Sequence, residues 1–103
     1  MNFSKIIANI SLDIGAIRLE PDKPFLWASG YLMPVYNDNR LLLSSAKYRQ
    51  IINDGFQEII TRKKISIDVV AGTATAGIPA ATSLSNTLET PLIYVRPSLK
   101  AHG

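Results

Sequence analysis

The second half of the chain constrains the fold most, because it reads as a strand, a turn, a helix and a second strand. Residues 65–71 are rich in β-branched side chains and predict a buried strand. The small residues 72–77 predict a tight turn, and residues 77–88 predict a helix that tolerates Pro79 in its first turn. Residues 91–95 predict the next strand. Such a unit is typical of a parallel α/β sheet with a right-handed crossover.

The first half mixes helical and hairpin patterns. Residues 2–17 carry apolar side chains at helical spacing, with Ser4 as a candidate N-cap. Residues 18–24 hold two prolines and several charges, which predicts a loop or an edge segment. Two apolar runs flank Ser29-Gly30 and predict a hairpin or bent strand pair over residues 25–38.

Pro34 confines the apolar run over residues 31–38 to an edge or bulge position.

A second helix is expected at about residues 45–63, capped by Ser44 or Ser45. We assign Trp27 and the isoleucine-rich stripes of both helices to the core.

Length and composition exclude several classes of protein. The 103 residues are enough for one small domain, and 47% apolar with 18% charged residues argues against disorder. The sequence has no cysteine and no apolar run near the ~20 residues of a membrane span, so we expect a cytoplasmic protein. The net charge is +3, but the tight basic cluster, Arg62-Lys63-Lys64, lies at a predicted helix end, where cations complement the helix dipole. We therefore expect no nucleic-acid partner.

The small-residue turn 72–77 is the first candidate site. It would let backbone N–H groups approach a phosphate at a helix N-terminus. It is neither a Walker A loop nor a dinucleotide fingerprint, because the required glycine and lysine spacing is absent. The alternative is a turn whose small residues only allow close helix–strand packing. The pattern alone leaves both readings open.

Cationic side chains that follow the last strand form the second candidate. Arg96, Lys100 and His102 lie beyond the carboxyl end of a parallel strand, where such sheets place ligands. Arg and Lys bind phosphate oxygens, and His exchanges a proton near neutral pH. The alternative is a solvated terminus with no specific role.

Tyr36, Asp38 and Arg40 form the third candidate. Tyr36 would stack on a planar ligand or fill the core, and Asp38 is close enough to Arg40 in sequence to pair with it and fix the backbone. No His/Cys/Asp cluster has metal-ligand spacing, and no Gly-x-Ser-x-Gly nucleophile elbow occurs.

Three segments together resemble the orotate phosphoribosyltransferases. Residues 25–30, followed by Pro34-x-Tyr36-x-Asp38-x-Arg40, look like that family's orotate-side segment. Residues 69–81 look like its pyrophosphate loop and the following helix, and residues 96–103 look like the start of its mobile catalytic loop. The match runs in the expected order along nearly the whole chain.

The resemblance implies the N-terminal part of a type I phosphoribosyltransferase fold, a parallel sheet with flanking helices plus an N-terminal hood segment. Residues 1–43 would form the N-terminal helix and hood, residues 44–96 a helix and the strand–loop–helix–strand unit, and residues 97–103 the start of the mobile loop. It further implies transfer of phosphoribosyl from 5-phosphoribosyl 1-pyrophosphate to orotate in pyrimidine synthesis. Mg²⁺ would arrive with the pyrophosphate substrate, with no protein ligand in this chain. The enzyme would be a cytoplasmic homodimer with shared active sites.

The resemblance also carries residue roles. Lys100 and His102 would be catalytic, with Lys100 neutralising charge on the leaving pyrophosphate. Arg96, Thr75 and Ala76 would join them in binding the phosphoribosyl pyrophosphate. Tyr36 would lie near the orotate pocket.

The sequence departs from the family pattern in several places. Pro97 and Ala28 stand where many members carry lysine, and Thr75-Ala76 stands where some carry Tyr-Lys. The family's acidic phosphoribosyl pyrophosphate motif is absent, so we expect a truncated chain that is inactive by itself. Two alternatives remain: another type I phosphoribosyltransferase acting on a purine base, and a non-enzymatic anion-binding or regulatory module.

Overall fold

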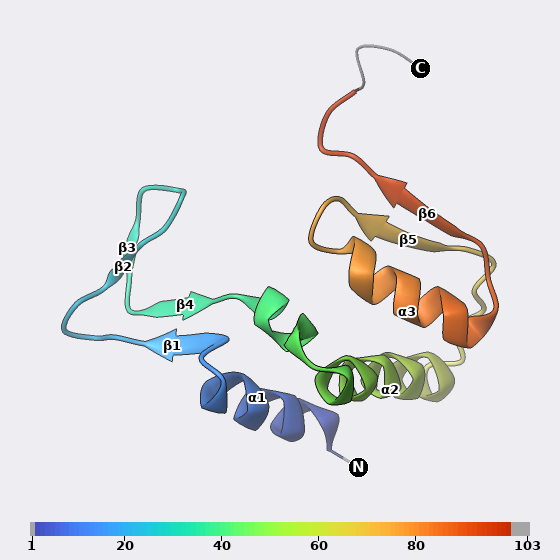
Figure 1. Cartoon of the computed structure of the whole chain (residues 1–103), viewed down its shortest axis with the longest axis horizontal. Coiled ribbons are helices and arrows are strands. Elements are labelled where there is room, and N and C mark those ends of the chain that lie inside the picture. The colour runs from blue at the N-terminus through green and yellow to red at the C-terminus, as the bar shows by residue number, and fades with distance from the viewer. Residues whose placement is uncertain (1, 100–103) are drawn as a thin grey trace. The chain divides into compact units, whose positions relative to one another are not determined.

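The structure, a computed structural model, describes residues 2–99 and divides between Tyr48 and Arg49 into two compact units (Figure 1). The elements of the first unit, in chain order, are α1 (Phe3–Asp13), β1 (Ile17–Leu19), β2 (Phe25–Leu26), β3 (Leu32–Met33), β4 (Val35–Asn37) and the 3-10 helix η1 (Asn39–Ser44). The second unit takes in most of α2 (Ala46–Arg62), followed by β5 (Val70–Thr73), α3 (Ile78–Leu88) and β6 (Leu92–Val95).

Helix α1 begins two residues earlier than a cap at Ser4 would place it. The side chain of Asn2 caps it, because Asn2 Oδ1 accepts a hydrogen bond from the Lys5 N–H at 3.1 Å. The predicted cap at Ser4 is therefore wrong. The helix also stops short of the predicted end, since Gly15 adopts a left-handed φ of 80° and Ile17 already belongs to β1.

Two antiparallel strand pairs follow α1. Strands β2 and β3 form the predicted hairpin, with Gly30 at φ 91° in its turn. Strand β4 pairs with β1, placing Arg18 opposite Tyr36. Pro34 separates β3 from β4, and its carbonyl oxygen accepts the Glu20 N–H at 2.7 Å. The predicted confinement of this proline to an edge or bulge agrees with that position.

Helix α2 begins where the sequence predicts. Ser45 Oγ accepts the Tyr48 N–H at 3.1 Å, which confirms the predicted cap. Arg62 lies in the last turn, with Lys63 and Lys64 directly after it. The basic cluster therefore sits at a helix C-terminus, the place where cations are most favourable.

The second unit contains the predicted strand–helix–strand arrangement. Strands β5 and β6 are parallel, with Val70 opposite Leu92 and Thr73 opposite Val95. Helix α3 connects them and packs against β5 (Figure 1). The predicted strand over residues 65–71 is misplaced, because β5 begins only at Val70. The ladder starts there since Val70 donates its N–H to Pro91 O at 3.0 Å, just before β6 begins.

The buried core of the described residues is small. Its apolar members are Ala16, Leu42, Val70 and Ala81. The assignment of the isoleucine stripes to the core is wrong, because the stripe residues of α1 and α2 are half-buried or exposed. Parallel sheets are normally covered on both faces, whereas Ile93 and Val95 remain 51% and 53% exposed here. No helix among residues 2–99 is long and apolar enough to cross a membrane.

Trp27 is also not a core residue. It is 37% exposed, and its Nε1–H donates to the carbonyl oxygen of Val35 at 2.9 Å. The indole therefore links the hairpin to β4 by a hydrogen bond. The indole N–H is a hydrogen-bond donor that is normally paired when the ring is partly buried, and the Val35 carbonyl is its acceptor here.

Candidate functional site

The turn after β5 is held in place by backbone hydrogen bonds. Ala74 donates its N–H to Val95 O at 2.8 Å, which pins the turn to β6. Gly77 donates to Thr73 O at 2.8 Å, and Ile78 donates to Thr75 O at 3.2 Å. The Ala74–Thr75 peptide bond is cis. The three hydrogen bonds fix the backbone of the turn and use the N–H groups of Ala74, Gly77 and Ile78, so the other N–H groups of the turn are the ones left for a ligand.

Those remaining donors are the N–H groups of Thr75 and Ala76. Both residues are exposed, and neither N–H forms a hydrogen bond within the described part of the chain. Helix α3 follows, with Gly77 as an N-cap that makes no side-chain hydrogen bond and with no acidic residue in the first turn. Free N–H groups at the positive end of a helix favour an anion. This geometry suits a phosphate or pyrophosphate group.

The small residues of the turn also serve close packing. A Cβ added at Gly72 would lie 2.9 Å from both Ala81 Cβ and Gly77 O. A Cβ at Gly77 would lie 2.7 Å from Thr73 O. Helix α3 therefore approaches β5 more closely than any side chain at these positions permits. The packing role is established, and the anion-binding role stays a prediction supported by the free donors.

Arg96 lies at the same edge of the sheet as this turn. It directly follows β6, whose last residue, Val95, pairs with Thr73 at the end of β5. Parallel strands bring their carboxyl ends together, so an exposed guanidinium and the free N–H groups share one edge. Lys100 and His102, the predicted catalytic residues, lie outside the described residues.

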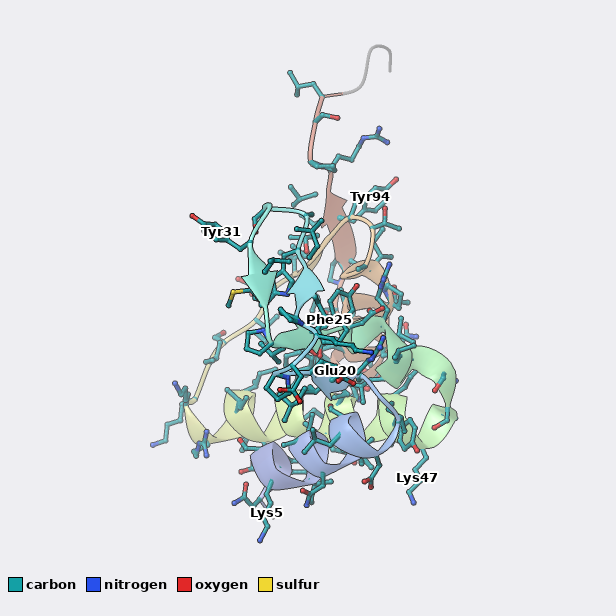
Figure 2. The ribbon with its side chains drawn as sticks, turned by 90° about the vertical axis from the view of Figure 1, so that its left-hand side faces the viewer. Lys5, Glu20, Phe25, Tyr31, Lys47 and Tyr94 are labelled. Carbon is teal, nitrogen blue, oxygen red and sulfur yellow. The ribbon has the colours of Figure 1, made fainter. Side chains whose placement is uncertain are left out.

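Tyr36 lies in β4 of the first unit and is 36% exposed. Its ring centroid is 5.7 Å from that of Phe25, with the planes tilted by 44°. Arg18 places its guanidinium carbon 4.9 Å from the centre of the same Phe25 ring. In Figure 2 the labelled side chain of Tyr31, at the hairpin turn, points away from the ribbon. Tyr36 thus has a supported ring with part of its surface open.

Asp38 and Arg40 form the predicted pair directly after β4. The Asp38 carboxylate accepts Arg40 Nε at 2.7 Å and Nη2 at 2.8 Å, which is a two-point fork. It also accepts the Arg40 backbone N–H at 3.1 Å and so caps η1. The hydrogen bonds from the Arg40 side chain hold the pKa of the Asp38 carboxyl below its ordinary value. The pair fixes the path of the chain as it leaves β4.

We expect this pair to stabilise the first unit at neutral pH and to fail in acid. The folded pKa of Asp38 lies below the unfolded value of about 4, so the stabilisation is complete above that pH. It is lost as the pH falls through the folded pKa. Denaturant unfolding of Asp38→Asn, which can still cap η1, should show a deficit at pH 7 that shrinks toward pH 2. A deficit that stays constant over this range would rule out the charge pair as its cause.

No group of three His, Cys, Asp or Glu side chains in residues 2–99 is placed to hold a metal ion.

Sequence reasoning missed the contact between Arg18, Phe25 and Tyr36. Residues 18–24 are predicted as a loop or an edge segment, with no pairing partner assigned, so nothing suggested that Arg18 stands opposite Tyr36 in an antiparallel pair. A recognised alternation over residues 17–19 would have been the only available signal.

The strand–loop–helix–strand unit and the preceding hairpin define a class of protein. They form the N-terminal part of the type I phosphoribosyltransferase fold, as predicted. The chain superposes on the crystal structure of orotate phosphoribosyltransferase from Aeropyrum pernix with a TM-score of 0.78 and 34% identity, covering 94% of this chain and 53% of that one.

Comparison with curated protein sequences points to the same family. The chain is 45% identical over 103 residues to orotate phosphoribosyltransferase of Cytophaga hutchinsonii and 48% identical over 103 residues to that of Listeria monocytogenes. Each match covers 100% of this chain and 49% of the relative, so the chain spans about half the length of these curated relatives. No protein-family profile matches the chain. The predicted resemblance to the orotate phosphoribosyltransferases is confirmed over the full chain.

Proposed function

We propose that this chain supplies the pyrophosphate loop and the orotate-side segment of an orotate phosphoribosyltransferase. The similarity of all 103 residues to enzymes of that name carries the proposal. In the reaction, the bond between ribose C1 and the pyrophosphate oxygen breaks, and C1 bonds to a ring nitrogen of orotate, which loses its proton. The products are orotidine 5′-monophosphate and pyrophosphate, in the de novo route to UMP.

The edge of the β5–β6 sheet would bind the pyrophosphate group. The free N–H groups of Thr75 and Ala76 would donate to its oxygens, with the positive end of α3 behind them. Arg96 would add a fork of N–H donors from the end of β6. The backbone hydrogen bonds of the turn hold the two N–H groups in place before substrate arrives, which limits the ordering cost of binding.

Lys100 and His102 would act from the segment after Arg96. Lys100 would neutralise the charge that develops on the leaving pyrophosphate, and His102 would assist in binding that group. We further propose a cytoplasmic homodimer in which this segment acts in the partner's active site. Mg²⁺, when bound with the pyrophosphate substrate, would supply additional neutralisation of its phosphate charge.

A hybrid enzyme tests the proposal. Residues 1–103 would replace the matching segment of the Cytophaga hutchinsonii enzyme, which is 45% identical over this stretch. We expect the hybrid to form orotidine 5′-monophosphate from orotate and to leave adenine unreacted. We expect the 103-residue chain alone to form none. Turnover of adenine in preference to orotate would indicate a purine enzyme, and a folded hybrid without either activity would contradict the proposal.

Replacing Lys100 with alanine in the hybrid should lower kcat by more than it raises KM. The expected loss in kcat is on the order of 10²-fold, because the charge is needed mainly where negative charge develops in the transition state. Steady-state kinetics with varied phosphoribosyl pyrophosphate would measure both constants, with Lys63→Ala at the end of α2 as the control. A raised KM with unchanged kcat would assign Lys100 to ground-state binding instead.

A further inference from the structure

Tyr36 is held by contacts that come from two different strands. Arg18 stands directly opposite Tyr36 in the β1–β4 pair, so both side chains project from the same face of that pair. Phe25 comes from β2, which belongs to the other strand pair, yet it contacts both of them. The Phe25 ring therefore contacts both a cation and an aromatic ring that belong to the other strand pair.

The distances are those of attractive contacts. The Arg18 guanidinium carbon lies 4.9 Å from the Phe25 centroid, within the range of a cation–π interaction. The Phe25 and Tyr36 rings are 5.7 Å apart at 44°, a tilted arrangement that aromatic pairs favour. Phe25 is half-buried, whereas Arg18 is exposed. The cation thus covers one side of Phe25 and limits the positions that the ring can take.

Neighbouring contacts hold the backbone of β4 on both sides of Tyr36. The Trp27 indole donates to Val35 O at 2.9 Å on one side, and the fork between Asp38 and Arg40 holds the chain on the other. The backbone at Tyr36 is therefore fixed without any contribution from the Arg18 side chain. What Arg18 and Phe25 add is control over the ring of Tyr36.

We propose that Arg18, acting through Phe25, is a positioning residue that sets the ring of Tyr36 for stacking on a planar anionic base. This rests on the proposed function, which places Tyr36 at the orotate side of the site. Arg18 touches neither reacting atom in this scheme. It acts by removing ring positions of Phe25 that would let Tyr36 turn out of the stacking orientation.

The test uses Arg18→Met, which keeps an unbranched side chain and removes the charge. In the 103-residue chain, nuclear Overhauser contacts between the Phe25 and Tyr36 rings should weaken. In the hybrid enzyme, KM for orotate should rise about two- to fivefold, the effect of losing one exposed cation–π contact. KM for phosphoribosyl pyrophosphate should stay unchanged.

Three further variants sharpen the result. Arg18→Lys keeps a cation and should restore most of the orotate KM. Phe25→Leu should match Arg18→Met, and the double variant should be little worse than either, because both residues act on Tyr36 through one ring. Lys23→Met removes a charge from the exposed loop between β1 and β2 and should change nothing.

The outcomes separate the two proposals. If Arg18→Met leaves both the Phe25–Tyr36 ring contacts and the KM for orotate unchanged, the positioning role is overturned and the proposed function stays intact. Equal effects on the KM values of both substrates would also overturn it. If the wild-type hybrid does not use orotate, the proposed function fails and the role toward orotate fails with it. The ring contacts alone then decide whether Arg18 orders Tyr36.

Discussion

Replacing Gly72 with valine is expected to lower the free energy of unfolding by about 3 kcal/mol, the upper part of the range for overpacking. A Cβ at this position would already lie 2.9 Å from Ala81 Cβ and from Gly77 O, and valine adds two further methyl groups. Since one obstacle is backbone, helix α3 would have to move away from β5. Small domains have ~5–15 kcal/mol of stability in total, so the loss should be plain in a denaturant titration.

Ala71→Val is the matched control for Gly72→Val. Ala71 is the preceding residue of the same strand and is exposed on the other face, where a β-branched side chain suits a strand. We expect its unfolding midpoint to stay within the error of wild type. Equal unfolding midpoints for Gly72→Val and wild type would show that α3 can move away from β5 without loss of stability.

A double-mutant cycle would locate the overlap at Gly72. Gly72→Ala combined with Ala81→Gly removes one of the two 2.9 Å contacts and leaves the one to Gly77 O. We therefore expect partial recovery relative to the sum of the single changes. Strict additivity would mean that Ala81 does not limit the approach of α3.

Asn53→Asp is the second change with a large expected effect, about 3 kcal/mol of destabilisation at pH 7. Asn53 is buried in α2, and its Nδ2 donates to Thr87 Oγ1 at 2.7 Å. The Thr87 hydroxyl donates its only proton to Ser83 O at 3.1 Å, so it has none to offer a carboxylate. The substitution would bury a charge that faces an acceptor.

The sign of the pH dependence distinguishes this mechanism from a general loss of packing. A protonated carboxyl at position 53 can donate to Thr87 Oγ1 in place of the amide. Its folded pKa would be raised, so the penalty should be small below about pH 4 and grow as the pH rises above the unfolded pKa. Unfolding titrations at pH 4 and pH 7 would measure this difference.

Asn86→Asp, on the exposed part of α3, should change the stability by no more than about 0.5 kcal/mol at either pH. A penalty for Asn53→Asp that is equally large at both pH values would exclude burial of charge as its cause.

The local signals in the sequence predicted most of the elements. Ser45 and the helical apolar spacing located α2, Pro79 marked the first turn of α3, and Ser29-Gly30 located the hairpin. Each signal acts within a few residues, through a cap, a fixed φ or a turn conformation. The same locality explains the pairing of Asp38 with Arg40, two residues apart.

Predictions that depended on distant partners were less accurate. Residues 65–69 have the composition of a strand, but β5 begins only where Pro91 and Leu92 supply a partner. Trp27 has the size of a core residue, but its indole N–H found an acceptor in β4 and the ring stayed 37% exposed. Ser4 was the predicted N-cap of α1, but Asn2, one residue before the helix begins, caps it instead.

The sequence by itself determined the class of fold, the turn of small residues at the end of a strand and the likeness to orotate phosphoribosyltransferases, because all three are patterns along the chain. Only the tertiary structure decided which donors of that turn are free. The N–H groups of Ala74, Gly77 and Ile78 donate hydrogen bonds within the second unit, whereas those of Thr75 and Ala76 have no acceptor among residues 2–99. It also decided that Arg18, Phe25 and Tyr36 meet, since strand register brings together residues that no local pattern connects.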